Sequence, residues 1–335
     1  MTLLVAAFTT QQKVGFTTVV ALTLGWAAFI VTHLRKEGTP PPGAEMELAP
    51  NRKPYFDDEG LEGPRLDRAL LGGLILMVIV AVGLPVYWAR EPSRQQGAVR
   101  GFNERAIGRG RILFQPAGSP IPEGNIGHFG CGGCHGVDGS GGITPYVMPD
   151  PLDPTKPPRL VKWKVPALNT VLLRFSPEEV RTILVYGRAN TPMPAWGVIG
   201  GGPMNDQQID DLVAYVGSIQ LGSAAVQKAN LADYGTDGAK LFDGFCSRCH
   251  TLGWSIGEPN VTGGGAFGPS LRDGDTLRQF PDPKAHAAFV TDGSEFAKPY
   301  GLRGVGGNEG GGMPGFGKML TKEQIDAIVE YERTL

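Results

Sequence analysis

The sequence predicts an all-α protein in which two N-terminal transmembrane helices precede two tandem copies of one small helical domain. Three observations lead to this prediction. Two long uncharged runs lie near the N-terminus, the remaining chain repeats itself once, and all four cysteines fall in two identical Cys-x-x-Cys-His frames. With 31 basic and 33 acidic residues the chain is close to neutral, which argues against a nucleic-acid partner.

Residues 1–100 are predicted to form a membrane anchor. Residues 14–34 and 69–89 contain no Asp, Glu, Lys or Arg, and about 20 apolar residues suffice to cross a bilayer as a helix. A buried core helix is one alternative, and a cleavable signal peptide is another for the first run. Basic residues after the first run place the loop 35–68 in the cytoplasm. The charges around the second run do not decide its orientation.

The rest of the chain contains one unit twice, in residues 101–222 and 223–335, called here the first and second repeats. Cys131 and Cys246 are 115 positions apart, and the stretches 209–218 and 325–334 align at an offset of 116. We therefore expect a duplicated domain.

Each repeat is expected to open and close with a helix. The opening helices are predicted over 103–114 and 237–245. Apolar side chains at helical spacing mark the closing helices: Ile209, Leu212, Val213 and Val216, then Ile325, Ile328 and Val329. Two capping boxes precede the closing helices, Asn205 with Gln208 and Thr321 with Gln324. The stretch Ser176-Pro177-Glu178-Glu179 marks a further helix start, with proline at the first helical position. Because glycine and proline dominate between these helices, the cores are thin, and a large apolar cofactor would fill them.

The motifs Cys131-Gly-Gly-Cys134-His135 and Cys246-Ser-Arg-Cys249-His250 allow three interpretations. A structural zinc site needs four ligands, and each motif offers two thiols and an adjacent histidine with poor geometry for the same ion. A thioredoxin-like dithiol needs a βαβ setting, which the sequence does not show. Covalent haem uses all three residues, two as thioether anchors and the histidine as iron ligand. We therefore expect two covalently attached haem c groups.

A second axial ligand is predicted from each repeat. Met193 and Met313 follow their motif histidines by 58 and 63 residues, and each precedes a proline in a glycine-flanked loop. Weaker candidates are Met148, Met204 and Met319, and two histidines, His128 and His286. The predicted iron ligands are accordingly His135 with Met193 and His250 with Met313.

The two repeats resemble class I c-type cytochromes, which have a first helix ending at Cys-x-x-Cys-His, a Met-Pro loop and a last helix bearing an aromatic residue. This resemblance implies that the last helix crosses the first, a role that suits Tyr215 and Tyr331. It also implies haem attachment outside the cytoplasm. The first repeat departs from the pattern at 115–130 and 142–166, insertions that we expect to contact a partner subunit.

The whole chain resembles dihaem subunits of respiratory complexes. This implies an electron-transfer subunit at the outer face of a prokaryotic plasma membrane, without catalysis on a substrate of its own. The stretch 201–220 favours a bc-type (mena)quinol:cytochrome c reductase, with cytochrome b and a Rieske protein as partners. The stretch 55–68 is similar to cbb-type haem-copper oxidase subunits, whose partners are the oxidase subunits, and a reductase–oxidase supercomplex is a further alternative. A dihaem peroxidase is the rival from another class, but two matching methionine loops argue against the open iron site it needs.

Overall fold

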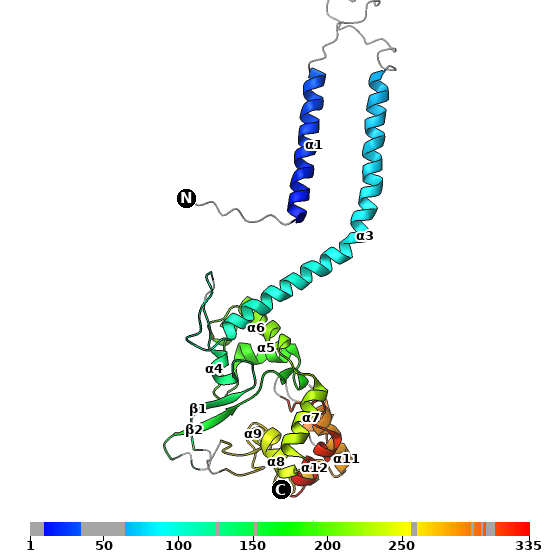
Figure 1. The fold of residues 1–335 in the computed structure, drawn as a ribbon. Coiled ribbons are helices and arrows are strands. Elements are labelled where there is room, and N and C mark those ends of the chain that lie inside the picture. The colour runs from blue at the N-terminus through cyan, green and yellow to red at the C-terminus, as the bar shows by residue number, and fades with distance from the viewer. Residues whose placement is uncertain are drawn as a thin grey trace, which may run out of the picture. The chain divides into compact units, whose positions relative to one another are not determined.

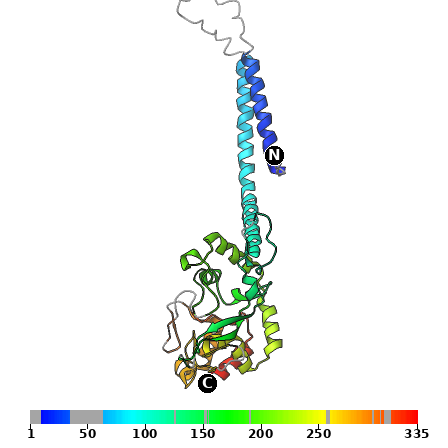
Figure 2. The same ribbon diagram turned by 90° about the vertical axis from the view of Figure 1, so that its left-hand side faces the viewer.

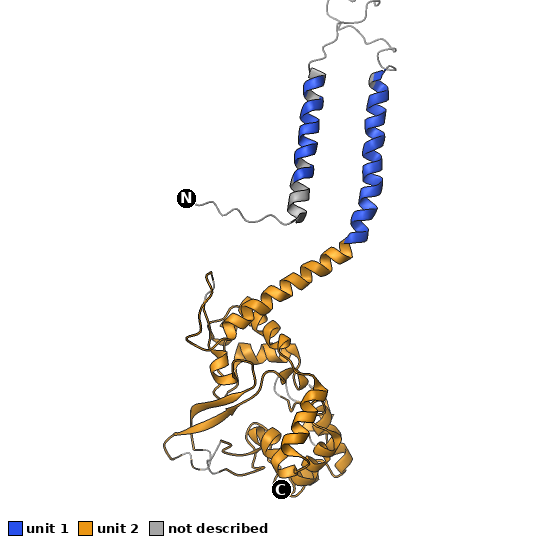
Figure 3. Ribbon diagram, viewed as in Figure 1, with its two compact units in different colours: residues 1–90 blue, residues 91–335 orange. Residues whose placement is uncertain are grey.

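The structure is a computed structural model, and it describes residues 10–34, 64–124, 127–150, 153, 155–189, 191–255, 260–295, 298–302, 304–305 and 312–335. The chain divides into two compact units, residues 1–90 and 91–335 (Figure 3). The first unit contains α1 (Thr10–Leu34) and the beginning of α3 (Pro64–Phe114). The predicted cytoplasmic loop lies almost entirely outside the described residues.

One helix of the described residues is long and apolar enough to cross a membrane, and it runs from Leu66 to Phe114 within α3. The described apolar part of α1, Val20–Phe29, is shorter than a span. The second predicted transmembrane helix and the predicted opening helix of the first repeat are not separate elements, because α3 continues unbroken through both. This continuity corrects the predicted helix end at residue 89.

Most of the regular elements in the second unit are helices (Figure 1). Its first repeat contains the end of α3, α4 (Cys131–His135), the strands β1 (Gly142–Met148) and β2 (Arg159–Val165), the 3-10 turn η1 (Val171–Leu173), α5 (Pro177–Tyr186), the 3-10 turn η2 (Val198–Gly200) and α6 (Asp206–Ser218). Its second repeat contains α7 (Ser223–Tyr234), α8 (Gly238–Leu241), the π-helical turn η3 (Phe242–Cys246), α9 (Ser247–His250), α10 (Asp275–Gln279), α11 (Pro283–Asp292), β3 (Pro299–Tyr300), β4 (Gly304–Val305) and α12 (Lys322–Glu332).

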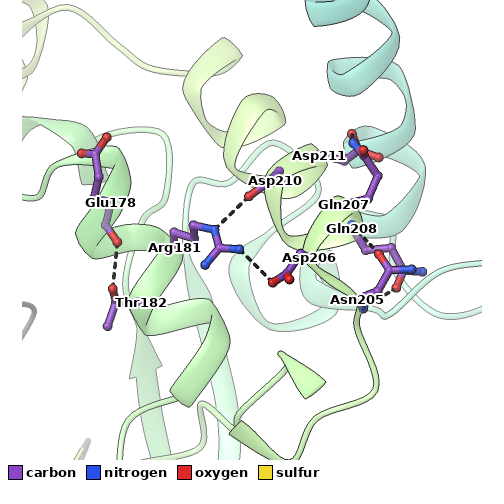
Figure 4. A network of polar contacts seen from close by, with 9 residues as sticks. All are labelled: Glu178, Arg181, Thr182, Asn205, Asp206, Gln207, Gln208, Asp210 and Asp211. Carbon is purple, nitrogen blue, oxygen red and sulfur yellow. Dashed lines mark hydrogen bonds and ion pairs between the residues drawn. The ribbon is translucent and has the colours of Figure 1, made fainter. Parts of the chain in front are cut away.

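The predicted caps are confirmed. Ser176, Asn205 and Thr321 each accept a hydrogen bond from the backbone N–H three residues on, and the Glu or Gln there bonds back to the cap. Figure 4 shows the cap at Asn205 and Gln208. Nearby, Arg181 on α5 binds Asp206 and Asp210 on α6, each at 2.9 Å, and so ties the two helices together.

The closing helix of each repeat crosses the opening helix at a glycine. A Cβ on Gly110 would lie 1.9 Å from the carbonyl oxygen of Asp211, and one on Gly238 would lie 2.3 Å from that of Ala327. Four residues after each glycine a phenylalanine packs on the tyrosine of the closing helix, with ring centroids 5.2 Å apart for Phe114–Tyr215 and 5.4 Å for Phe242–Tyr331. The predicted crossing is therefore present twice, with the same residue types.

We predict that Gly110→Ala destabilises the chain by about 3 kcal/mol or more, because the added methyl cannot occupy the place of a backbone oxygen. Gly108→Ala is the matched control, since a Cβ there meets nothing within 4 Å on the same helix and alanine favours a helix. Thermal unfolding followed by circular dichroism should show a lowered midpoint for the first variant alone. Equal midpoints for the two variants would contradict the close crossing.

The all-α prediction omits two short antiparallel hairpins. Strands β1 and β2 pair from Gly142↔Val165 to Met148↔Arg159 (Figures 1 and 2). Along β2, alternate residues are buried, namely Val161, Trp163 and Val165, while those between them are exposed. This alternation is the pattern of a strand with one covered face, and proline-rich flanks obscure it in the sequence.

The covered face of this hairpin packs against the second repeat. Trp163 meets Trp254 edge to face with ring centroids 5.4 Å apart, and Tyr146 packs on Trp163 at 5.5 Å. The opposite face carries exposed Ile143, Val147 and Leu160. The expected contact of this insertion with a partner subunit stays a prediction.

Candidate haem-binding sites

Each Cys-x-x-Cys-His motif lies on a short helical segment at the edge of its repeat's core. Cys131 and Cys249 are half-buried, Cys246 is buried and Cys134 is exposed. All four cysteines are free thiols, so none is used in a disulfide. In the part of the chain that the structure describes, no group of three or more His, Cys, Asp or Glu side chains could hold a metal ion.

Burial raises the pKa of three of the four thiols. Burial raises the pKa of Cys131 to about 11, and burial together with the neighbouring Glu332 carboxyl raises the pKa of Cys246 well above its usual value. Burial raises the pKa of Cys249 as well, against the opposing effect of nearby arginines. Reactive dithiols have a lowered pKa, which none of these three thiols shows.

Both motif histidines are oriented in the same way. The Nδ1 of His135 donates to the carbonyl oxygen of Pro166 at 3.0 Å, and the Nδ1 of His250 donates to that of Pro269 at 2.9 Å. Because Nδ1 carries the proton, Nε2 is the free nitrogen that a metal would take. Burial lowers the pKa of His135, which favours the neutral, ligating form.

Sequence analysis missed these two prolines, although a signal was present. Each lies in a Pro-x-Leu triplet downstream of its motif, Pro166-Ala-Leu168 and Pro269-Ser-Leu271. In both triplets the leucine N–H bonds to a glycine carbonyl after the motif, from Leu168 to Gly139 and from Leu271 to Gly263. The loop that carries each proline is therefore held at two points. The proline carbonyl binds the motif histidine, and the leucine N–H two residues later binds a glycine carbonyl that follows the motif.

The two methionine loops are built alike. The backbone N–H of Arg188 donates to the Met193 carbonyl at 3.0 Å, and that of Ser294 donates to the Met313 carbonyl at 2.9 Å. Each loop closes on a glycine with positive φ at the end of the preceding helix, Gly187 or Gly293, where a Cβ would collide with the Met-Pro peptide. Both methionines are half-buried.

The weaker ligand candidates are engaged elsewhere. Met204 and Met319 are core residues, 1% and 6% exposed, and Met148 packs against the tryptophan cluster of the hairpin. His128 directs Nδ1 at the carbonyl of Ile112 and Nε2 at that of Ser119, at 2.8 and 2.7 Å. The Nε2 of buried His286 lies 3.0 Å from Glu332.

These residues fit a haem group. Each repeat offers a buried or half-buried imidazole with a free Nε2, two thiols and a methionine loop. The Nε atoms of Arg174 and Arg248 are buried without a hydrogen-bond partner among the described residues, which suits an anionic group beside the motifs. Two repeats of this construction define a c-type cytochrome, in which haem is bound covalently and carries electrons.

The comparison with protein families gives a more specific assignment. The profile of the family described as cytochrome c oxidase, cbb3-type, subunit III matches residues 129–216 and 234–331, which together make up more than half of the chain. The chain belongs to this family. No curated protein and no solved structure matches it.

Proposed function

We propose that the chain is a dihaem electron-transfer subunit of a membrane-bound respiratory oxidase. Cys131 and Cys134 would anchor one haem, and Cys246 and Cys249 the other. The iron ligands would be His135 with Met193 and His250 with Met313. The observation that carries this proposal is the duplication of the site, with a proline carbonyl orienting each histidine and a glycine-closed loop presenting each methionine.

The division of the chain follows from the same assignment. Residues 1–100 would anchor the protein through two transmembrane helices, and residues 101–222 and 223–335 would form the two haem domains. Covalent haem attachment takes place outside the cytoplasm, so both domains would lie at the outer face of a prokaryotic plasma membrane. The long apolar helix within α3 supports the anchor.

In this function the protein positions and tunes the haems. The haem supplies the one-electron chemistry, and the chain supplies axial ligands, burial and hydrogen bonds that set its potential. The proline carbonyls hold the Nδ1 protons and so fix which nitrogen faces the iron. Packing of Trp163 on Trp254 holds the hairpin of the first repeat against the segment that follows the second motif.

The family match favours an oxidase over the bc-type reductase preferred from the sequence. Purification of the full-length chain in a mild detergent tests this preference. We expect a haem-copper oxidase subunit to co-purify, with the chain reduced before the oxidase haems in single-turnover experiments. Co-purification of cytochrome b and a Rieske protein without oxidase subunits would overturn the proposal in favour of the reductase.

A further inference from the structure

Three arginines lie together between the two haem-binding motifs. Arg174 follows the turn η1, Arg188 follows α5, and Arg248 stands between the two cysteines of the second motif. We call these residues the arginine cluster. Two come from the first repeat and one from the second.

Aromatic rings hold the guanidinium groups in place. Those of Arg174 and Arg188 lie 5.7 and 5.5 Å from the ring centre of Phe175, and that of Arg248 lies 5.3 Å from the ring centre of Trp254. Arg248 also donates from Nη2 to the carbonyl oxygen of Lys164 on β2, at 3.2 Å. Its side chain thus contacts both repeats, through Trp254 of the second and Lys164 of the first.

The cluster has cationic groups without matching anions. The buried Nε atoms of Arg174 and Arg248 have no hydrogen-bond partner among the described residues, and no ion pair within that part of the chain includes any of the three arginines. Burial, followed by the charges of Arg248 and Arg188, lowers the pKa of Arg174 to about 10. Like charges withdrawn from water are costly unless an anion joins them.

The cluster lies close to both motifs. Arg248 belongs to the second motif, and the Lys164 carbonyl that it binds is two residues before Pro166, whose carbonyl binds His135 of the first motif. An anion held by the cluster would therefore lie near both motifs.

We propose that the arginine cluster binds the propionate carboxylates of the haem attached to the first motif, with Arg248 supplied by the second. This assignment rests on the proposed haem attachment. The first haem is chosen because Arg174 and Arg188 belong to the first repeat and the Arg188 N–H bonds the Met193 loop. The shared Arg248 makes the potential of the first haem depend on a residue of the second site.

The test is potentiometric titration of the full-length, haem-loaded chain, followed by absorption spectroscopy. Arg174→Gln and Arg248→Gln each remove a positive charge that opposes oxidation of the iron. We expect each to shift the reduction equilibrium of the first haem about tenfold toward the oxidised form, or about 59 mV for a one-electron couple. The first haem is identified as the one altered by Met193→Ala.

Resonance Raman spectroscopy supplies a second readout, because the propionate bending bands report the hydrogen bonds of those carboxylates. We expect the propionate bands to shift in the glutamine variants and also in Arg174→Lys and Arg248→Lys. Because lysine keeps the positive charge, the lysine variants should change the reduction potential less than the glutamine variants do. Arg278→Gln is the control, since Arg278 pairs with Asp275 on the surface, and neither readout should change.

The possible failures are distinguishable. Wild-type chain without covalent haem would overturn the proposed function itself. Both haems present, with unchanged potentials and Raman bands in the glutamine variants, would overturn only the arginine assignment, as would shifts confined to the second haem. If a glutamine variant does not fold, the lysine variant at the same position provides the test. Unshifted Raman bands in that lysine variant would also contradict the proposal.

Discussion

The Met193→Ala chain is expected to lose the absorption band of sulfur–iron ligation from one haem, and the Met313→Ala chain from the other. Loss of a thioether ligand also lowers the reduction potential, by an amount on the order of 0.1 V, because methionine favours the reduced iron. The two loops have matching hydrogen bonds and closing glycines, so the two variants should behave alike. Absorption spectra and redox titration of each variant measure both effects.

Core methionines provide the control for this prediction. Met204 and Met319 are buried in the same two repeats, and Met204→Leu and Met319→Leu conserve their volume at a cost of less than about 1.5 kcal/mol. Both control chains should retain two sulfur–iron bands. If Met193→Ala or Met313→Ala also retains both bands, the ligand assignment for that loop is wrong.

The second large effect is expected at Gly268, which lies directly against the second motif histidine. A Cβ at this position would lie 2.5 Å from Cε1 of His250 and 2.9 Å from Nε2. In Gly268→Ala the ring must therefore move, and it would lose its hydrogen bond to Pro269 along with the position that suits an iron ligand. We expect the potential of the second haem to change, and its ligation to become heterogeneous, while the first haem keeps its spectrum.

Electron paramagnetic resonance of the oxidised chain would resolve the two haems for this test. Gly222→Ala is the matched control, because a Cβ there meets nothing within 4 Å and its backbone is extended. That variant should give the wild-type spectrum. A wild-type spectrum from Gly268→Ala as well would show that the His250 ring is not confined as the structure indicates.

The sequence predicts the helical parts of the sites well, because short-range chemistry determines them. Helix caps such as Asn205 with Gln208 are formed by side chains within one turn, and the apolar stripe from Ile209 becomes the buried face of α6. The duplication also shows in the sequence, since both repeats keep the glycine, phenylalanine and tyrosine of their crossing helices.

Contacts between distant segments could not be predicted in this way. The Pro166 carbonyl reaches His135 across 31 residues, and a backbone oxygen leaves no residue-type signal of its own. The arginine cluster combines residues of both repeats, and only the fold brings them together. The hairpin was missed for another reason: alternation along 159–165 is present but lies within a proline-rich stretch.

The central claim is that each repeat carries its own covalent haem, and the haem content of the purified chain tests it most directly. Intact-mass spectrometry combined with the pyridine haemochrome assay should give two haem c groups per full-length chain. Replacing both Cys131 and Cys134 by alanine should leave one haem c group per chain. Replacing both Cys246 and Cys249 by alanine should also leave one. A wild-type chain with one haem, or with none, would contradict the account.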